Sequence, residues 1–198
     1  MTAIRERKCI YHLTALENLE SIIENGLLSR KSLVALNTTF IDVADHEIIR
    51  KRTSLNLVDC VPFHFHTYTD FDVCVQRRFD KVFIYLAIYK NKARDKNFLI
   101  IPKHPLSCES NEVFDYDEGF EHIDWDIMHL TSQQKGYDPS IRMAECLSNH
   151  CDLSISDINI IFVPNCDVEK SVSDILMHHS ITSIDVKITP CLFAHKEW

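Results

Sequence analysis

Glycine is scarce in this sequence of 198 residues, which contains only three, at positions 26, 119 and 136. The glycine-rich loops that hold phosphates in P-loop enzymes and dinucleotides in Rossmann folds need several glycines within a few residues, so neither class fits. The G-x-S-x-G sequence around the nucleophile of α/β-hydrolases is also absent. Three large enzyme classes are thereby disfavoured.

Long apolar runs and paired cysteine motifs are missing as well. No apolar run is long enough to cross a bilayer, and the charged, polar start at residues 1–8 does not read as a signal peptide. The eight cysteines form no C-x-x-C pair, which argues against a zinc ribbon or a redox motif. We therefore expect a cytoplasmic protein with reduced thiols, no metal centre and no membrane partner.

Composition and charge set the domain count and the kind of partner. The chain is 45% hydrophobic and 25% charged and has no low-complexity linker or internal repeat, so we expect a single domain over residues 1–198. The net charge is −8, but residues 1–103 hold 16 Lys and Arg against 12 Asp and Glu, whereas residues 104–198 hold 5 against 17. Only the basic first half suits a polyanion such as a nucleic acid.

The first patterned segment predicts a short strand followed by a helix. Apolar residues then recur at helical spacing up to Gly26, where a left-handed helix end is expected. Thr14 and Glu17 have the spacing of a capping box. These rules give no reason for His12, two residues before Thr14, so the functional interpretation begins there.

The remaining pattern is rich in strands. Residues 81–89 form a β-branched and aromatic run typical of a central strand buried on both faces. In residues 60–66 the phenylalanines alternate with His64 and His66, which predicts a strand with two faces. Further strands are expected at 98–102, 143–147, 158–163 and 184–188, a helix at 168–178, and a long acidic loop at 103–140 with one short helix near 123–130. Strands outnumber helices and regular βαβ crossovers are lacking, so we expect an α+β fold with a mixed sheet.

Several polar groups leave alternatives open. His64 and His66 share a strand face as metal ligands do, but a third ligand at suitable spacing is missing. The basic triplet at residues 50–52 is either a solvated helix end or part of a site. Glu145, between an alanine and a cysteine, is either a charge on an edge strand or a carboxylate projecting into a cleft.

Four blocks, taken in order, resemble the DarT family of NAD-dependent DNA ADP-ribosyltransferase toxins. The first is Y-H-L-T at residues 11–14, followed by N-L-x-S-I-x-x-x-G-L-L-S. A basic I-x-x-R segment, a V-P-F-x-F strand and an R-x-A-E-x-L segment follow at 49–52, 61–65 and 142–147. The resemblance covers about residues 10 to 190.

This resemblance implies an ADP-ribosyltransferase fold: a split, mixed β-sheet core with flanking helices and with NAD bound in the cleft between its halves. It implies an NAD-binding set, with a histidine that bonds a ribose hydroxyl and an arginine that contacts the dinucleotide. The matching positions are His12, Leu13, Thr14, Asn18, Arg50 and Arg52. Arg52, in preference to Arg50, matches the arginine that assists catalysis, and Glu145 matches the catalytic glutamate.

The residue types suit the implied reaction. Cleavage of the nicotinamide–ribose bond develops positive charge on the ribose, as in glycoside hydrolysis. A carboxylate beside the ribose interacts more strongly with that transition state than with the substrate, and this difference raises the rate. An arginine offers a bidentate partner to the pyrophosphate.

The resemblance also implies partners. Single-stranded DNA is the expected acceptor, with RNA, protein or a catalytically inactive binding role as alternatives, and the protein is expected to act as a toxin or phage-defence effector. Toxins of the family are paired with a macrodomain antitoxin, so such a partner is implied. Residues 66–72 depart from the family's pattern near where it receives nucleic acid. The candidate acceptor-binding residues are His64, His66, Arg77, Arg78 and Arg142.

Overall fold

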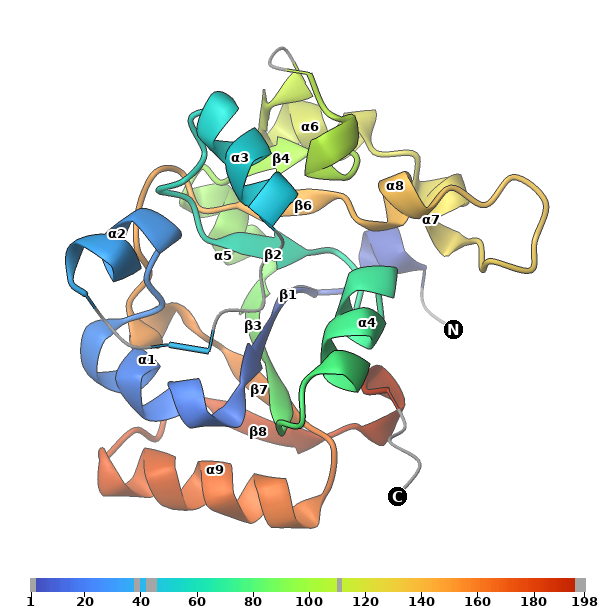
Figure 1. The fold of residues 1–198 in the computed structure, drawn as a ribbon. Coiled ribbons are helices and arrows are strands. Elements are labelled where there is room, and N and C mark those ends of the chain that lie inside the picture. Colours follow the sequence, from blue (N-terminus) through green and yellow to red (C-terminus); the bar gives the residue numbers. More distant parts are fainter. Residues whose placement is uncertain (1–2, 38–39, 42–45, 110–111, 195–198) are drawn as a thin grey trace.

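A mixed β-sheet forms the centre of the computed structural model, which describes residues 3–37, 40–41, 46–109 and 112–194 (Figure 1). Within these residues the strand order is β5-β4-β6-β2-β1-β3-β7-β8, and all pairs are antiparallel except β7 with β8. The strands are β1 (Cys9–Ala15), β2 (Pro62–His64), β3 (Phe83–Tyr89), β4 (Leu99–Ile101), β5 (Phe114–Asp115), β6 (Glu145–Leu147), β7 (Ile160–Val163) and β8 (Asp185–Ile188). The expected α+β fold is confirmed.

The sheet is nearly divided between β1 and β2. Strand β1 pairs with β3 along its whole length, from Cys9 opposite Tyr89 to Ala15 opposite Phe83. It pairs with β2 at a single position, Tyr11 opposite His64. The two strands therefore separate on either side of this pair, and the expected split sheet is confirmed.

Helices surround the sheet and cover both of its faces (Figure 1). They are α1 (Leu19–Asn25), α2 (Arg30–Ala35), α3 (His46–Ser54), α4 (Asp70–Arg78), α5 (Lys90–Asp95), α6 (Tyr116–His122), α7 (Trp125–His129), α8 (Pro139–Arg142) and α9 (Cys166–His178). Among the described residues, none of these helices has the length and apolar character needed to traverse a bilayer.

Strand β3 and helix α9 form where the sequence predicts them. In β3, six of the seven residues are buried, because β1 and β7 flank it and side chains pack on both faces. Helix α9 begins at Asn165, whose side chain accepts a hydrogen bond from the Val168 amide, and it buries Val168, Val172 and Leu176. These positions are four residues apart, as an amphipathic helix requires.

The first helix begins later than the sequence predicts, and the Thr14–Glu17 capping box is wrong. Thr14 still belongs to β1, where it pairs with Ile84, and a 3-10 turn over Leu16–Asn18 precedes α1. Glu17 forms an ion pair with Lys81 at 3.0 Å. Strand pairing therefore overrides the local capping preference. Gly26 does end α1, at φ 89°, and a Cβ there would lie 2.6 Å from the Leu153 carbonyl oxygen.

The expected loop at 103–140 is wrong in part, because α6 and strand β5 lie within it, whereas α7 forms where a short helix is expected near 123–130. These short helices bury Trp125 and Met128, and the Trp125 ring lies 5.5 Å from the ring of Phe65. Acidic residues in the first turns of α6 and α7 interact favourably with the helix dipole. The two helices are too short to show a clear apolar periodicity in the sequence. The strand expected at 143–147 begins only at Glu145, after α8.

Candidate active site

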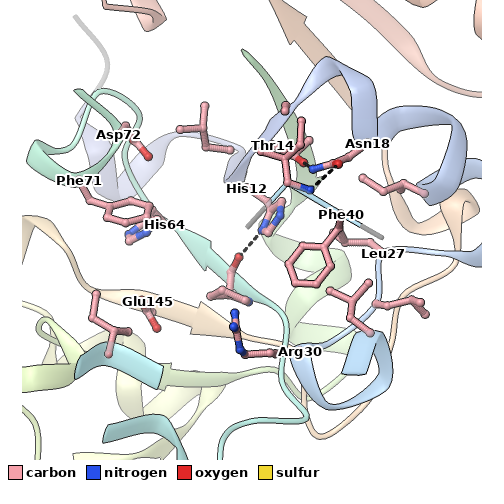
Figure 2. A pocket seen from close by; sticks show the side chains of 18 of the residues that line it. His12, Thr14, Asn18, Leu27, Arg30, Phe40, His64, Phe71, Asp72 and Glu145 are labelled. Atoms are coloured by element: carbon pink, nitrogen blue, oxygen red, sulfur yellow. Dashed lines mark hydrogen bonds between the residues drawn. The ribbon is translucent and has the colours of Figure 1, made fainter. Parts of the chain in front are cut away.

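A cleft opens where β1 and β2 separate (Figure 2). It has an empty volume of about 1270 Å³, part of which is open solvent. Its wall includes His12, Leu13, Thr14 and Ala15 of β1, Asn18, Ser21, Ile22 and residues 26–28 around α1, Arg30 and Leu33 of α2, and Phe40, Ile41, Ile48 and Arg52. The lining is completed by Pro62, His64, Phe71, Asp72, His104, Met143 and Glu145. Figure 2 shows His64, Phe71, Asp72 and Glu145 across the cleft from Asn18 and Phe40. Residues more than 130 positions apart in the sequence thus face one space.

His12 is held in one orientation and is uncharged at neutral pH. Its Nδ1 lies 2.8 Å from the Pro62 carbonyl oxygen, which can only accept, so Nδ1 carries the proton. Burial lowers the pKa of the ring to about 4, partly opposed by that hydrogen bond, and the nearby His64 and Arg52 lower it further. The neutral tautomer leaves Nε2 as an acceptor, which suits a sugar hydroxyl.

Asn18 links two segments that line the cleft. Its side-chain nitrogen donates to the Thr14 hydroxyl at 3.1 Å, and its oxygen accepts from the Ile41 amide at 3.1 Å. The amide therefore links the end of β1 to the segment that carries Phe40, whose ring lies at the cleft in Figure 2. Thr14 and Asn18 thus have a positioning role in the structure in place of the expected helix cap.

A buried ion pair joins α3 to β6. The Arg52 Nη2 lies 2.6 Å from Glu145 Oε1, and Glu145 is only 3% exposed. Neither Arg52 Nε nor Glu145 Oε2 has a hydrogen-bond partner. Since an unpaired buried polar atom costs about 1–3 kcal/mol, these two atoms suit a ligand that would satisfy them.

His64 and Asp72 lie on the same side of the cleft as Glu145. His64 is directly opposite Glu145 across the β2–β6 ladder, so both side chains project from one face of the sheet. Asp72, 1% exposed at the start of α4, accepts a hydrogen bond from the Thr69 amide in a capping box. Burial raises the pKa of its carboxyl, against the opposing effects of His64 and of the bonds from Thr69. His64 Nδ1 and Asp72 Oδ1 have no partner.

The other predicted site residues lie outside this cleft. Arg50 is exposed on α3, 3.8 Å from Glu47. Arg77 and Arg78 are exposed in the last turn of α4. The Arg142 Nη2 lies 3.1 Å from His66 Nε2, and its Nη1 donates to the Leu130 carbonyl at 2.7 Å, which joins the end of α8 to the end of α7. None of these five is among the cleft-lining residues, so their substrate contacts remain predictions.

Sequence reasoning did not single out Arg30, Phe40, Phe71 or Asp72, although all four line the cleft. Phe71 and Asp72 lie in residues 66–72, which differ from the sequence that follows the V-P-F-x-F strand in the family. The Thr69-x-x-Asp72 spacing was available as a capping-box signal, but it gives no indication that the helix would begin at a cleft.

A family model described as ssDNA thymidine ADP-ribosyltransferase, DarT, matches residues 11–195. The fold is similar to that of Thermus sp. 2.9 DarT in complex with ADP-ribosylated ssDNA, with 18% identity, coverage of 96% of this chain and 97% of that one, and a TM-score of 0.76. The same Thermus protein in complex with NAD+ matches at 18% identity, 96% and 98% coverage and a TM-score of 0.74.

A second relative is longer than this chain. Thermosipho africanus DarTG in complex with ADP-ribose matches at 20% identity and a TM-score of 0.68, covering 94% of this chain but 51% of that one. No curated protein matches the sequence at a significant level.

A nearly split mixed sheet, with a neutral histidine, an arginine and a buried glutamate facing one cleft, defines an NAD-dependent ADP-ribosyltransferase, and the expected enzyme class is confirmed. Within that class, the match over residues 11–195 shows that the chain belongs to the DarT family.

Proposed function

We propose that this enzyme transfers the ADP-ribose group of NAD to a thymine base of single-stranded DNA. The observation that supports this most strongly is the convergence of His12 from β1 with the Arg52–Glu145 pair from α3 and β6 at one cleft. The family description names the acceptor, and one similar structure holds ADP-ribosylated ssDNA.

NAD binding would use the wall built from β1. The free Nε2 of His12 accepts a hydrogen bond from a ribose hydroxyl, while Thr14 and Asn18 hold the segment that places Phe40 against the cofactor. The unpaired Nε of Arg52 donates to the dinucleotide.

The chemistry would occur at Glu145. The bond between the ribose C1′ and the nicotinamide nitrogen breaks, and neutral nicotinamide leaves with the bonding electrons. The free Oε2 of Glu145 stabilises the positive charge that develops on the ribose, while Arg52 orients the carboxylate through Oε1. A ring nitrogen of the base then forms the new bond to C1′ and gives up its proton, for which the unpaired Oε2 of Glu145 is the proposed acceptor.

The base would enter from the side of His64, Phe71 and Asp72. His64 lies across from Glu145 in the sheet, and Phe71 offers an aromatic face of the kind on which unpaired bases stack. The exposed Arg77 and Arg78 at the far end of α4 are a candidate path for the phosphate backbone.

The biological role we propose is that of a bacterial toxin or phage-defence effector, held in check by a macrodomain antitoxin. The similarity to the longer Thermosipho DarTG chain is consistent with such a pairing. A cytoplasmic location fits the eight cysteines, all of which carry free thiols.

Incubation of the purified protein with labelled NAD tests this function. The acceptors are single-stranded oligonucleotides with and without thymidine, a uridine-containing RNA and a protein mixture. We expect label only on thymidine-containing DNA, its loss in Glu145→Gln, and its retention in Glu118→Gln, which changes an exposed glutamate of α6. Label on RNA or protein instead would refute the acceptor, and undiminished label in Glu145→Gln would refute the site.

A further inference from the structure

A second cluster of reactive side chains lies at the ends of the strands that carry His64 and Glu145. Asp59 and Cys60 precede β2, and His150 follows β6. The donor atoms of these three residues lie within 4.8 Å of one another, the one such group within the described ranges. His150 Nδ1 is 2.8 Å from Asp59 Oδ1 and 3.9 Å from Cys60 Sγ.

The backbone holds these donors in place without help from a ligand. The Ser148 amide donates to the Val61 carbonyl at 2.9 Å, and the Val61 amide donates to the Ser148 hydroxyl at 2.8 Å. That hydroxyl donates in turn to the Cys151 carbonyl at 2.6 Å. His150 has φ 50°, which is uncommon for a residue other than glycine, and its ring contacts Asp59. A ligand would therefore meet a largely preformed site.

We propose that Asp59, Cys60 and His150 bind a zinc ion that joins the segment entering β2 to the segment leaving β6. A thiolate, an imidazole and a carboxylate are the three donor types of zinc sites, whereas magnesium and calcium prefer oxygen alone. Three protein ligands leave the fourth tetrahedral position to water. The thiolate and carboxylate charges balance that of the ion.

The neighbouring groups are compatible with this assignment. Lys31 contacts Asp59 through Oδ2 at 3.4 Å, so at Oδ1 the metal would replace only the hydrogen bond to His150, which is itself a proposed ligand. Burial raises the pKa of the Cys60 thiol to about 11, against an opposing effect of His150. The metal must displace that proton, so affinity increases with pH. His64 and His66 are separate from this cluster.

The zinc site would act on stability and not on the reaction itself. None of its three ligands lines the catalytic cleft, so the proposal does not depend on the proposed function. By fixing the ends of β2 and β6, the ion would stabilise the half of the sheet that carries Glu145.

The test is titration of the chelator-treated full chain with zinc chloride, followed by calorimetry and by thermal unfolding with and without zinc. We expect one bound ion per chain and a higher unfolding temperature with zinc. Loss of one ligand in His150→Ala or Cys60→Ser should weaken binding by more than about 100-fold, since even outer partners of a metal ligand account for about 10- to 100-fold. Matched controls are His178→Ala and Cys166→Ser, which change exposed residues of α9.

Cobalt substitution adds a readout of coordination. A thiolate-to-cobalt charge-transfer band should appear in the unchanged protein and in Cys166→Ser, and it should be lost in Cys60→Ser. His150 is exposed, so its replacement decides the question even where the buried Cys60 variant folds poorly. Zinc affinity in His150→Ala equal to that of His178→Ala, or no binding to the unchanged chain, would overturn the proposal.

Discussion

The two halves of the sheet differ in how completely their polar groups are satisfied. On the β1–β3–β7 side, β1 and β3 pair at seven positions and both faces are covered by apolar side chains. On the β2–β6 side, the ladders are three residues long. The buried side-chain atoms without a partner, among the described residues, all belong to positions 52 to 76 and to Glu145. Arg52, His64, His66 and Glu145 belong to or flank the β2–β6 half, whereas Asp72 and Gln76 lie on α4, which packs against β1 and β3. The first half chiefly stabilises the fold, and the second half holds most of the groups that a substrate would satisfy.

The largest expected effect is a loss of stability when the apolar core on the β1–β3–β7 side is disrupted. Leu86 is fully buried in β3, so Leu86→Ala should lower the free energy of unfolding by about 2–5 kcal/mol. Leu106→Ala, at a site 44% exposed, is the matched control and should change little. Urea denaturation measures both. Equal losses in the two variants would mean that burial on this side does not determine stability.

On the β2–β6 side, substitutions at the cleft should affect activity more than stability. Arg52→Ala should lower kcat by about 100- to 1000-fold, the scale seen when one transition-state partner is removed. Arg50→Ala is the control, because Arg50 is exposed and outside the cleft. Single-turnover rates of ADP-ribosylation, with circular dichroism to confirm folding, provide the measurement. A larger loss in the Arg50 variant would reverse the assignment of the two arginines.

An intermediate effect is expected at His12. Its replacement by alanine leaves a ribose hydroxyl without a partner, so NAD affinity should fall by about 1–3 kcal/mol, measured by calorimetry. Leu36→Ala, which changes an exposed residue, is the control. An affinity equal to that of the control would remove His12 from the binding site.

His12 also makes a prediction about pH. Burial lowers its pKa from 6.5 to about 4, so the unfolded chain binds the proton more readily than the folded one. The stability associated with His12 is therefore present above pH 6.5 and is lost as the pH falls toward 4. Unfolding free energies at several pH values should show a shallower decline in His12→Asn than in the unchanged chain. Parallel curves would show that this ring does not titrate in the stated range.

The parts of the structure that could be predicted from sequence are those fixed by neighbouring residues in the chain. The apolar run of β3 and the spacing of α9 are visible in consecutive residues, so the sequence predicts both elements even though each packs against distant parts of the chain. Thr14 was misread because its pairing with Ile84 across the sheet outweighs a local cap. Within residues 103–140 the sequence predicts α7 but not α6, which is short and packs Phe120 against the distant Phe65.

The candidate site divides in the same way. The sequence places His12, Arg52 and Glu145 in ordered motifs and favours Arg52 over Arg50, and the structure puts Arg52 at the cleft and Arg50 outside it. Phe40 enters the cleft through the bond between Asn18 and Ile41, a contact of 23 residues' separation that no local pattern encodes. Residues that reach the cleft only through tertiary contacts, such as Phe40, cannot be recognised from a local sequence pattern.

The smallest expected effect concerns Asp72, whose carboxyl both caps α4 and lines the cleft. Burial raises the pKa of its carboxyl above 3.8, so the folded state binds this proton more tightly and loses stability as the pH rises through that raised pKa. Asp72→Asn keeps an acceptor for the Thr69 amide and removes the buried charge, so it should unfold at equal or slightly higher urea concentration at pH 7.5. Asp70→Asn, an exposed neighbour, is the control. If Asp72 contributes to acceptor recognition, the more stable variant should also have a lower kcat/KM for DNA with unchanged NAD affinity. A variant that gains stability and loses no activity would limit Asp72 to the helix cap.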